Sequence, residues 1–309
     1  MSRYLHPCTE LGSVFHNRPA KHAEDRRLRW VIAITTIMMI GEIVGGLITH
    51  SLALLSDAGH MLTHLFALVM SLAAVRIASR PTDERRTFGY YRIEVLAALF
   101  NALTIFVIVG YIFYGAVRQI LAPQPIHAHT MLGIAVLGLI VNLAGAWMLH
   151  GVMGHDLNIR GAFVHLLTDT LSSVAIVVGG VVMLYTEWYW VDIVLSLVIG
   201  GVVLTWGLKL LLDASHVLLE STPKELSLPD VCNAIKSVPG VQDVHDAHVW
   251  EITSQMYSMT GHLVVQNMTV RETQRILAAV NHTVHERFRI GHTTFQFEVE
   301  APSAVPSHS

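Results

Sequence analysis

Long apolar segments separated by short polar connections fill the first two thirds of the chain. Six such segments stand out, at residues 30–49, 52–78, 93–120, 130–150, 159–186 and 188–212. Each is about long enough to cross a hydrocarbon core of roughly 30 Å as an α-helix. The pattern therefore predicts an all-α transmembrane domain of six helices over residues 30–213.

The pattern changes after about Glu220, where shorter elements replace the long apolar segments. The periodicities predict a helix at 229–237, strands at 241–253 and 256–266, a long helix from Thr269 and a last strand at 292–300. Thr269 and Glu272 have the spacing of a capping box, which supports that helix start. The order αββαβ is typical of a ferredoxin-like sandwich, so we expect a small cytoplasmic α+β domain over residues 220–300.

Lysine and arginine are concentrated on one side of the predicted bundle. They occur before the first span and between the second and third spans, whereas the 1–2, 3–4 and 5–6 connections contain none. Cytoplasmic connections carry an excess of these residues, so we expect both termini in the cytoplasm. Residues 1–29 lack the apolar core of a signal peptide and are expected to be a cytoplasmic tail. Residues 301–309 are expected to be a disordered tail.

Composition agrees with a membrane protein and argues against several other classes. Only 14% of the 309 residues are charged and the mean hydropathy is +0.50, which is too apolar for an ordinary soluble protein. The formal net charge is −3 and no large basic block occurs, so we expect no nucleic-acid partner. Cys8 and Cys232 form no spaced framework and are expected to be free thiols. We expect no organic cofactor. We expect the protein to lie in a bacterial inner membrane, although a protein of an organelle membrane would have the same sequence pattern.

Two of the predicted spans each carry a pair of metal-ligand side chains four residues apart. His60 and His64 form the pair in the second span, and His165 and Asp169 form it in the fifth. Residues at i and i+4 share one face of a helix, so two pairs can present four ligands to a tetrahedral ion. A histidine in an apolar helix can also be a hydrogen-bonded packing residue. Asp169, however, needs a buried partner, and a cation is the simplest one.

The expected ligand set contains three imidazoles and one carboxylate. It favours zinc, cobalt, nickel or iron(II) over magnesium and calcium, which prefer oxygen ligands. Each imidazole must be neutral to bind metal, so protons and metal compete for the same atoms, and this competition could couple metal export to proton entry. Asp57, one turn before His60, could orient that histidine, or it could pack or cap near the end of its helix.

Several motifs together resemble the cation diffusion facilitator family of metal/proton antiporters. They are SLALLSDAGHMLTH at 51–64, TFGYYRIEVLAAL at 87–99, HLLTD at 165–169 and VHDAHVW at 244–250. The resemblance implies six spans, a cytoplasmic ferredoxin-like domain, a homodimer, and export of zinc or a similar ion such as cobalt, nickel, cadmium or iron(II). It places the transport site on His60, His64, His165 and Asp169. His64 departs from the pattern, since zinc-selective members usually carry aspartate there and histidine resembles a branch linked to cobalt and other ions.

The resemblance also suggests metal ligands in the cytoplasmic domain. His245, His262 and Glu298 fall where the family places regulatory metal ligands, and His248 and His292 are nearby candidates. The domain would then sense metal as well as dimerise. One polar face of a sheet would give the same sequence pattern, so this alternative stays open.

A charge pair completes the features that the resemblance implies. Arg92 and Glu220 resemble the pair that holds the family's dimer together near the membrane surface. They could equally be two separate solvated charges.

Two other classes of function share the paired ligands. A zincin-type metallohydrolase needs glutamate directly after the first histidine as general base, and Met61 stands there, so we expect no enzyme. A metal-gated channel or a metal sensor would carry the same ligands without proton exchange. The sequence alone does not separate a metal-gated channel or a metal sensor from an antiporter.

Overall fold

A computed structural model describes residues 22–78, 85–150 and 157–299 of the chain. The chain divides into two compact units, the first formed by residues 1–89 and 97–211 and the second by residues 90–96 and 212–309. The expected tail at 301–309 and most of the expected N-terminal tail lie outside the described residues. The expected tail at 1–29 also overlaps the first helix, which begins at His22.

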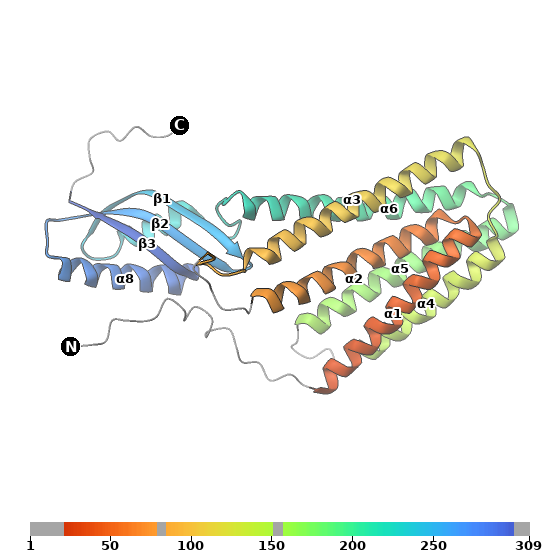
Figure 1. The fold of residues 1–309 in the computed structure, drawn as a ribbon, viewed down its shortest axis with the longest axis horizontal. Helices are drawn as coiled ribbons and strands as arrows, with labels where there is room; N and C mark the ends of the chain where they lie inside the picture. The colour runs from red at the N-terminus through yellow and green to blue at the C-terminus, as the bar shows by residue number, and fades with distance from the viewer. Residues whose placement is uncertain (1–21, 79–84, 151–156, 300–309) are drawn as a thin grey trace. The chain divides into compact units, whose positions relative to one another are not determined.

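Long helices make up the first unit, and two of them continue into the second unit (Figure 1). They are α1 (His22–Thr49), α2 (Leu52–Ala78), α3 (Arg92–Leu121), α4 (Ala128–His150), α5 (Leu157–Thr186) and α6 (Trp190–Leu218). Among the described residues, five of these helices are long and apolar enough to cross a membrane, namely all except α2, several of whose side chains are not described. α6 extends beyond the predicted end at residue 212, because apolar residues continue through Leu218.

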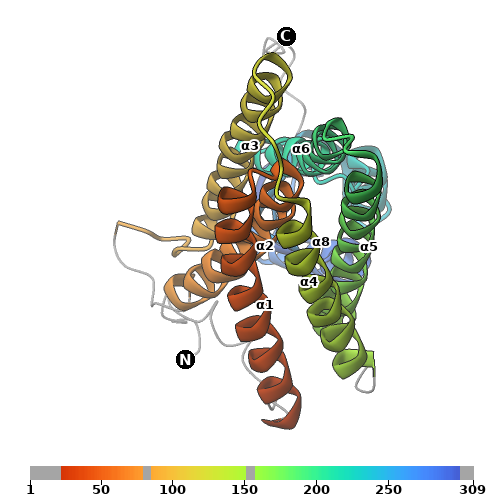
Figure 2. The ribbon, with the colours of Figure 1, turned by 90° about the vertical axis from the view of Figure 1, so that its right-hand side faces the viewer.

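The helices of the first unit pack through close apolar contacts. α1, α2, α4 and α5 are neighbours, with α1 beside α2 and α4, and α5 beside α2 and α4 (Figure 2). Gly45 on α1 allows a close approach of Ile134 on α4, since a side chain at this glycine would overlap the isoleucine. α3 and α6 share an apolar cluster built on Ile105, Val109 and Val203.

The start of α2 is held by a buried carboxylate from α6. Asp192 accepts hydrogen bonds from the backbone nitrogens of Leu52 (2.7 Å) and Ala53 (3.2 Å) and from Oγ of Ser51 (2.5 Å). Oγ of Ser51 in turn accepts from the backbone nitrogen of Leu54 (3.2 Å). The first N–H groups of a helix have no partner within the helix, and a negative charge there is favourable. The cap of α2 thus combines Ser51, directly before the helix, with Asp192 of α6, 141 positions later in the chain.

The second unit contains a three-stranded sheet and two helices in the order α7 (Leu228–Lys236), β1 (Val241–Thr253), β2 (Met256–Val265), α8 (Val270–Phe288) and β3 (Ile290–Glu298). The sheet order is β1-β2-β3, with β1 and β2 antiparallel and β2 and β3 parallel. The predicted αββαβ order is confirmed. The predicted last strand was placed two residues too late, because Arg289, in the left-handed conformation, ends α8 and β3 starts immediately after it.

Apolar residues of α7, α8 and the sheet form the core of the second unit. Val231, Val280 and Leu263 are fully buried members of this core. The capping box at Thr269 and Glu272 is formed, which confirms the predicted start of α8. Side chains of successive strand residues point to opposite faces, so the neighbours of core residues such as Leu263 lie on the other face of the sheet. That face carries the histidines considered below.

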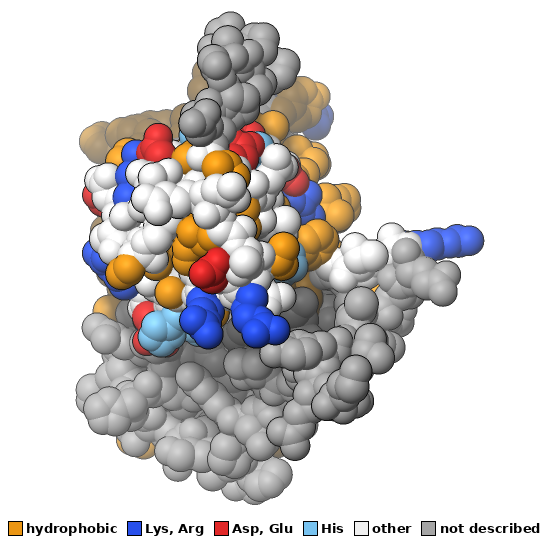
Figure 3. All heavy atoms as spheres, turned by 90° about the vertical axis from the view of Figure 1, so that its left-hand side faces the viewer, with side chains coloured by type: hydrophobic (Ala, Val, Ile, Leu, Met, Phe, Trp, Pro, Cys, Tyr) orange, Lys and Arg blue, Asp and Glu red, His pale blue; other side chains and the backbone are white. Residues whose placement is uncertain are grey.

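Charged side chains of both signs are interleaved on the visible face of the second unit (Figure 3). No continuous basic surface gathers among the described side chains of this face.

Candidate metal centres

The first candidate centre lies on α2, where His60 and His64 are one helical turn apart. Their ring centroids are 4.6 Å apart and the rings meet edge to face. His60 is only 4% exposed, and His64 is partly buried. The helix therefore places both imidazoles on one face, as the i, i+4 spacing predicts.

Asp169 on α5 completes the described part of this centre. Its carboxylate is fully buried, and its Oδ1 atom lies 3.2 Å from Nε2 of His60. His165 stands one turn earlier on α5, but its side chain lies outside the described ones. Three of the four predicted ligands are thus described, and an imidazole from α2 meets a carboxylate from α5. Imidazole and carboxylate groups are suitable ligands for zinc and similar divalent ions.

Hydrogen bonds beside these ligands tie α2 to α5. Oγ of Ser172 donates to Oδ1 of Asp57 over 2.6 Å and also lies 2.9 Å from the backbone oxygen of Asp169. Asp57 is 1% exposed. The hydrogen bond of Asp57 thus crosses from one ligand-bearing helix to the other. Nearby, Nδ2 of Asn142 on α4 donates to Oγ of Ser173 on α5 over 3.1 Å.

The second candidate centre lies on the sheet of the second unit, where strand register brings three ligands together. His245 on β1 stands directly opposite His262 on β2. Glu298 on β3 pairs with Val264 in the parallel register, two residues along from His262. Positions two apart on a strand share a face, so the three side chains lie on the same side of the sheet.

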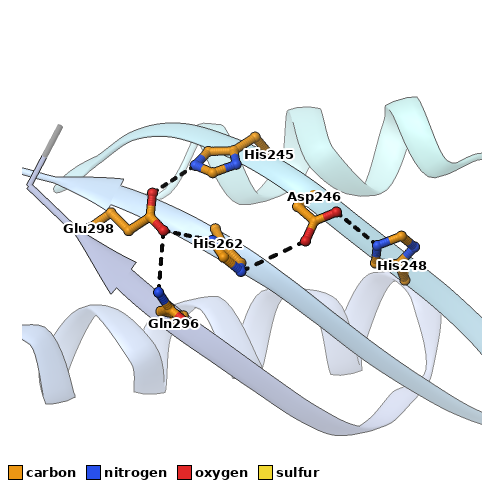
Figure 4. A network of polar contacts seen from close by, with 6 residues as sticks. All are labelled: His245, Asp246, His248, His262, Gln296 and Glu298. Carbon is orange, nitrogen blue, oxygen red and sulfur yellow. Dashed lines mark hydrogen bonds and ion pairs between the residues drawn. The ribbon is translucent and has the colours of Figure 1, made fainter. Parts of the chain in front are cut away.

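Two short contacts join this group (Figure 4). Nε2 of His245 lies 2.9 Å from Oε2 of Glu298, and Nδ1 of His262 lies 2.7 Å from Oε1 of the same carboxylate. One ligand atom from each of the three residues falls within 4.8 Å of the others, and this is the one such group among the described residues. A carboxylate only accepts hydrogen bonds, so both rings must donate their protons to it. A metal ion would take the place of those two protons.

The charge on Glu298 is favoured by its neighbours. Burial raises the pKa of Glu298, but the hydrogen bonds from His262 and His245 outweigh burial, and the resulting pKa lies below the ordinary value. The carboxylate is therefore ionised at neutral pH and has the charge state that a metal ligand needs.

A β-bulge extends the polar network along β1. Asp246 has a positive φ of 49°, and the register slips between His245 and His248. The extra residue keeps His248 on the same face as His245 although the two are three positions apart. Nε2 of His248 donates to Oδ1 of Asp246 over 2.9 Å, and this bond lowers the pKa of Asp246. Oδ2 of Asp246 lies 3.8 Å from Nε2 of His262 (Figure 4).

His248 and His292 lie outside the group of three. His248 reaches the group only through Asp246. His292 stands opposite Ser258 on β2, four positions along β2 from His262. A strand rises about 3.3 Å per residue, so His292 is roughly 13 Å from the group along the sheet.

The predicted charge pair is formed within the second unit. Nη2 of Arg92 lies 2.6 Å from Oε1 of Glu220, with side-chain exposures of 42% and 56%. The two residues are 128 positions apart in the chain. The sequence left open whether these residues form a pair or are two separate solvated charges. The second alternative is therefore wrong.

Several residues that shape the centres or the helices that carry them were not singled out from the sequence. Asp192 is an acidic residue inside an apolar segment, which is a signal that could have identified it. Asp246 lies inside the VHDAHVW motif, but its placement depends on the bulge. Trp206 on α6 gives no signal in the sequence, yet its ring lies 5.2 Å from that of His60, centroid to centroid.

Family models match consecutive parts of the chain. The model of the cation efflux transmembrane domain matches residues 28–219. The model of the cation efflux protein cytoplasmic domain matches residues 223–300. Their boundary agrees with the change of pattern that the sequence shows at about Glu220.

Individual proteins match nearly the whole chain. The metal cation efflux system protein CzcD of Cupriavidus metallidurans is 41% identical over 284 residues, which cover 92% of this chain and 89% of CzcD. The cadmium, cobalt and zinc/H(+)-K(+) antiporter of Bacillus subtilis is 37% identical over 278 residues, which cover 88% of this chain and 89% of the antiporter. A solved structure, the metal-bound C-terminal domain of the CzcD transporter, is 34% identical in sequence to the part of this chain that it matches. The match covers 24% of this chain and 100% of that domain, and its TM-score is 0.22.

Proposed function

Because this chain belongs to the cation efflux family of metal transporters, we propose that it exports a divalent transition-metal ion from the cytoplasm in exchange for protons. The broader function follows from the family: the protein is an integral, multi-pass membrane protein that exports divalent metal cations. The family consists of transporters rather than enzymes. The exchanged ion, the metal and the ligand residues are our proposal.

The contact between His60 and Asp169 carries the proposal. The two side chains are buried, come from different helices and lie 3.2 Å apart. With His64 beside His60, they supply ligands from α2 and α5 to a single ion. His165 would be the fourth ligand, because it stands one turn before Asp169 on the same helix. A tetrahedral ion bound there would be enclosed by side chains alone.

Zinc is the metal that we favour, with cobalt, nickel, cadmium and iron(II) as alternatives. Three imidazoles and one carboxylate suit zinc and cobalt better than ions that prefer oxygen ligands. The antiporter of Bacillus subtilis is named for cadmium, cobalt and zinc, which supports this range. His64 in place of an aspartate is the feature that could widen the range toward cobalt.

Proton exchange is supported by the chemistry of the ligands. An imidazole binds a metal ion only when the nitrogen concerned carries no proton, so a proton and a metal ion exclude each other at His60 and His64. Moving one charge through 100 mV is worth about 2.3 kcal/mol, so each entering proton contributes to the driving force for metal export. The relative in Bacillus subtilis is named as an antiporter of metal against H(+) and K(+), which supports the same mechanism.

The arrangement in the membrane is also part of the proposal. We infer six spans with both termini in the cytoplasm of a bacterium, since lysine and arginine cluster on that side. The second unit would be a ferredoxin-like domain that joins two copies of the chain into a homodimer, and Arg92 with Glu220 would support that dimer. The cluster of His245, His262 and Glu298 would bind metal and sense its cytoplasmic concentration.

A sensor or metal-gated channel is the second candidate function. The cluster on the sheet favours it, because a metal site in the cytoplasmic domain can report metal without moving it. The two functions differ in proton movement. An antiporter moves protons against metal, whereas a sensor or channel has no need of them.

The test is metal-driven proton flux in liposomes that contain the purified protein and a trapped pH dye. We expect a saturable proton signal with zinc and its absence in Asp169→Asn, which keeps the size of the side chain but removes its charge. Glu286→Gln is the matched control, since it removes a carboxylate from the exposed face of α8. Metal movement without a proton signal would support the channel, and tight binding without any movement would support the sensor.

A further inference from the structure

A tryptophan from α6 covers the two histidines of α2. The ring of Trp206 lies 5.2 Å from that of His60 and 6.2 Å from that of His64, centroid to centroid. It meets His64 edge to face, with an interplanar angle of 76°. One large aromatic side chain from a third helix thus contacts both imidazoles at once.

The packing of α6 on its neighbours positions the backbone at Trp206. Gly207, the next residue, lies against Ile105 of α3, and any side chain there would overlap that isoleucine. Val203, one turn earlier, belongs to the same apolar cluster. At its start, α6 holds the first turn of α2 through Asp192. The indole therefore sits on a helix whose backbone is anchored to α3 and to α2.

Asp169 approaches His60 from α5, and Trp206 approaches both histidines from α6. The space around the two imidazoles is thereby limited on two sides. An ion that needs six ligands must keep bound waters beside the protein ligands, and a water takes about 30 Å³. Zinc is satisfied by four ligands in a tetrahedron and needs no such space.

We propose that Trp206 is a specificity-determining residue of the transport site, which excludes additional waters and so favours four-coordinate ions over octahedral ones. The inference rests on the proposed function, because it assigns the covered histidines to the transported ion. Manganese is the octahedral ion to compare with zinc, since it prefers six oxygen ligands. Trp206 itself donates no ligand to the metal; it acts through the space that it fills.

The test compares zinc and manganese transport in liposomes for wild type, Trp206→Ala and Trp206→Phe. We expect the zinc-to-manganese ratio of kcat/KM to fall about tenfold in Trp206→Ala, the lower end of discrimination by pocket shape. Phenylalanine keeps an aromatic wall and should retain most of the ratio. Trp147→Ala is the matched control, because Trp147 on α4 is 80% exposed. An unchanged ratio in Trp206→Ala would overturn the inference while zinc transport itself continues, whereas wild type without metal transport would overturn the proposed function.

Tryptophan fluorescence gives a second test that does not need the alanine variant to fold. Cobalt bound at the histidines would lie beside the indole and quench it. We expect saturable quenching in wild type that is reduced in Trp206→Phe and unchanged in Trp147→Phe. Equal quenching in wild type and Trp206→Phe would show that Trp206 does not border the bound ion, and the inference would then be wrong.

Discussion

His60 on α2 and Asp169 on α5 meet in a buried contact of 3.2 Å between Nε2 and Oδ1. An imidazole and a carboxylate from two helices therefore point at one place inside an apolar bundle. A metal ion arriving there would separate this pair and bond to both partners. Occupancy of the site would in this way change how α2 and α5 are held together, which is a physical basis for coupling binding to helix movement.

His64, beside this contact, allows a prediction about metal selectivity. Replacing His64 by aspartate adds a negative charge and an oxygen ligand, so transport should shift toward zinc and manganese relative to cobalt and nickel. We expect a change of about tenfold in the ratio of rates, the scale on which changes around a metal alter its affinity. Uptake of the four ions into liposomes measures it. His129→Asp on the exposed start of α4 is the control, and unchanged ratios in His64→Asp would mean that His64 is not a ligand.

The cluster on the sheet gives a prediction for metal binding outside the membrane. In a chain that carries Asp169→Ala, so that the transport site is removed, Glu298→Gln should abolish tight zinc binding by the second unit. Asp246→Asn should weaken it about tenfold, because Asp246 faces the second nitrogen of His262 and helps to orient the ring. Isothermal titration calorimetry of the full chain measures both affinities.

The matched control for that experiment is Glu286→Gln, in which an exposed carboxylate of α8 is removed without touching the sheet. If zinc still bound tightly to the chain with Asp169→Ala and Glu298→Gln together, the cluster would be a set of hydrogen-bonded surface residues rather than a metal site.

Asp192 gives a prediction for stability. Its carboxylate caps α2 with bonds to two backbone nitrogens and the hydroxyl of Ser51. Asp192→Ala should destabilise the protein by about 2 kcal/mol, the upper range for loss of a helix cap. Thermal unfolding in detergent measures the effect. The control is Asp213→Ala, which removes an exposed partner of Lys224 worth at most about 1 kcal/mol. Equal unfolding midpoints for the two variants would contradict the capping role.

Much of this architecture could be predicted because it depends on local pattern. Apolar length gave the positions of the helices, and the i, i+4 rule put His60 and His64 on one face. The strand at Val241–Thr253 and the start of α8 after Thr269 agree with the structure, since alternation and a capping box are both local signals.

The remaining features depend on contacts between distant residues. No local pattern indicates that Asp192 reaches the start of α2, 140 residues earlier in the chain. The position of His248 on the same face as His245 depends on the bulge at Asp246, which strict alternation does not foresee. Trp206 resembles any other aromatic residue of an apolar helix until the packing of α6 brings it to the histidines.

The ion pair of Arg92 and Glu220 allows a prediction about assembly. Its side chains are 42% and 56% exposed, and exposed pairs stabilise a chain by about 0–1 kcal/mol. Arg92→Ala should therefore leave the unfolding midpoint almost unchanged. If the pair supports a dimer, as we propose, the same variant should shift the monomer–dimer equilibrium toward the monomer in sedimentation experiments in detergent.

A charge exchange separates this role from a general effect of lost charge. Arg92→Glu alone should disrupt the dimer more than Arg92→Ala, and adding Glu220→Arg should restore it, because the pair is then re-formed in the opposite sense. Lys224→Ala is the matched control, since Lys224 forms a similarly exposed pair with Asp213 in the same unit. Dimer content equal to wild type in Arg92→Ala and Arg92→Glu would leave Arg92 and Glu220 as a surface ion pair without a part in assembly, because an unpaired or repulsive charge at a position that supports the dimer should weaken it.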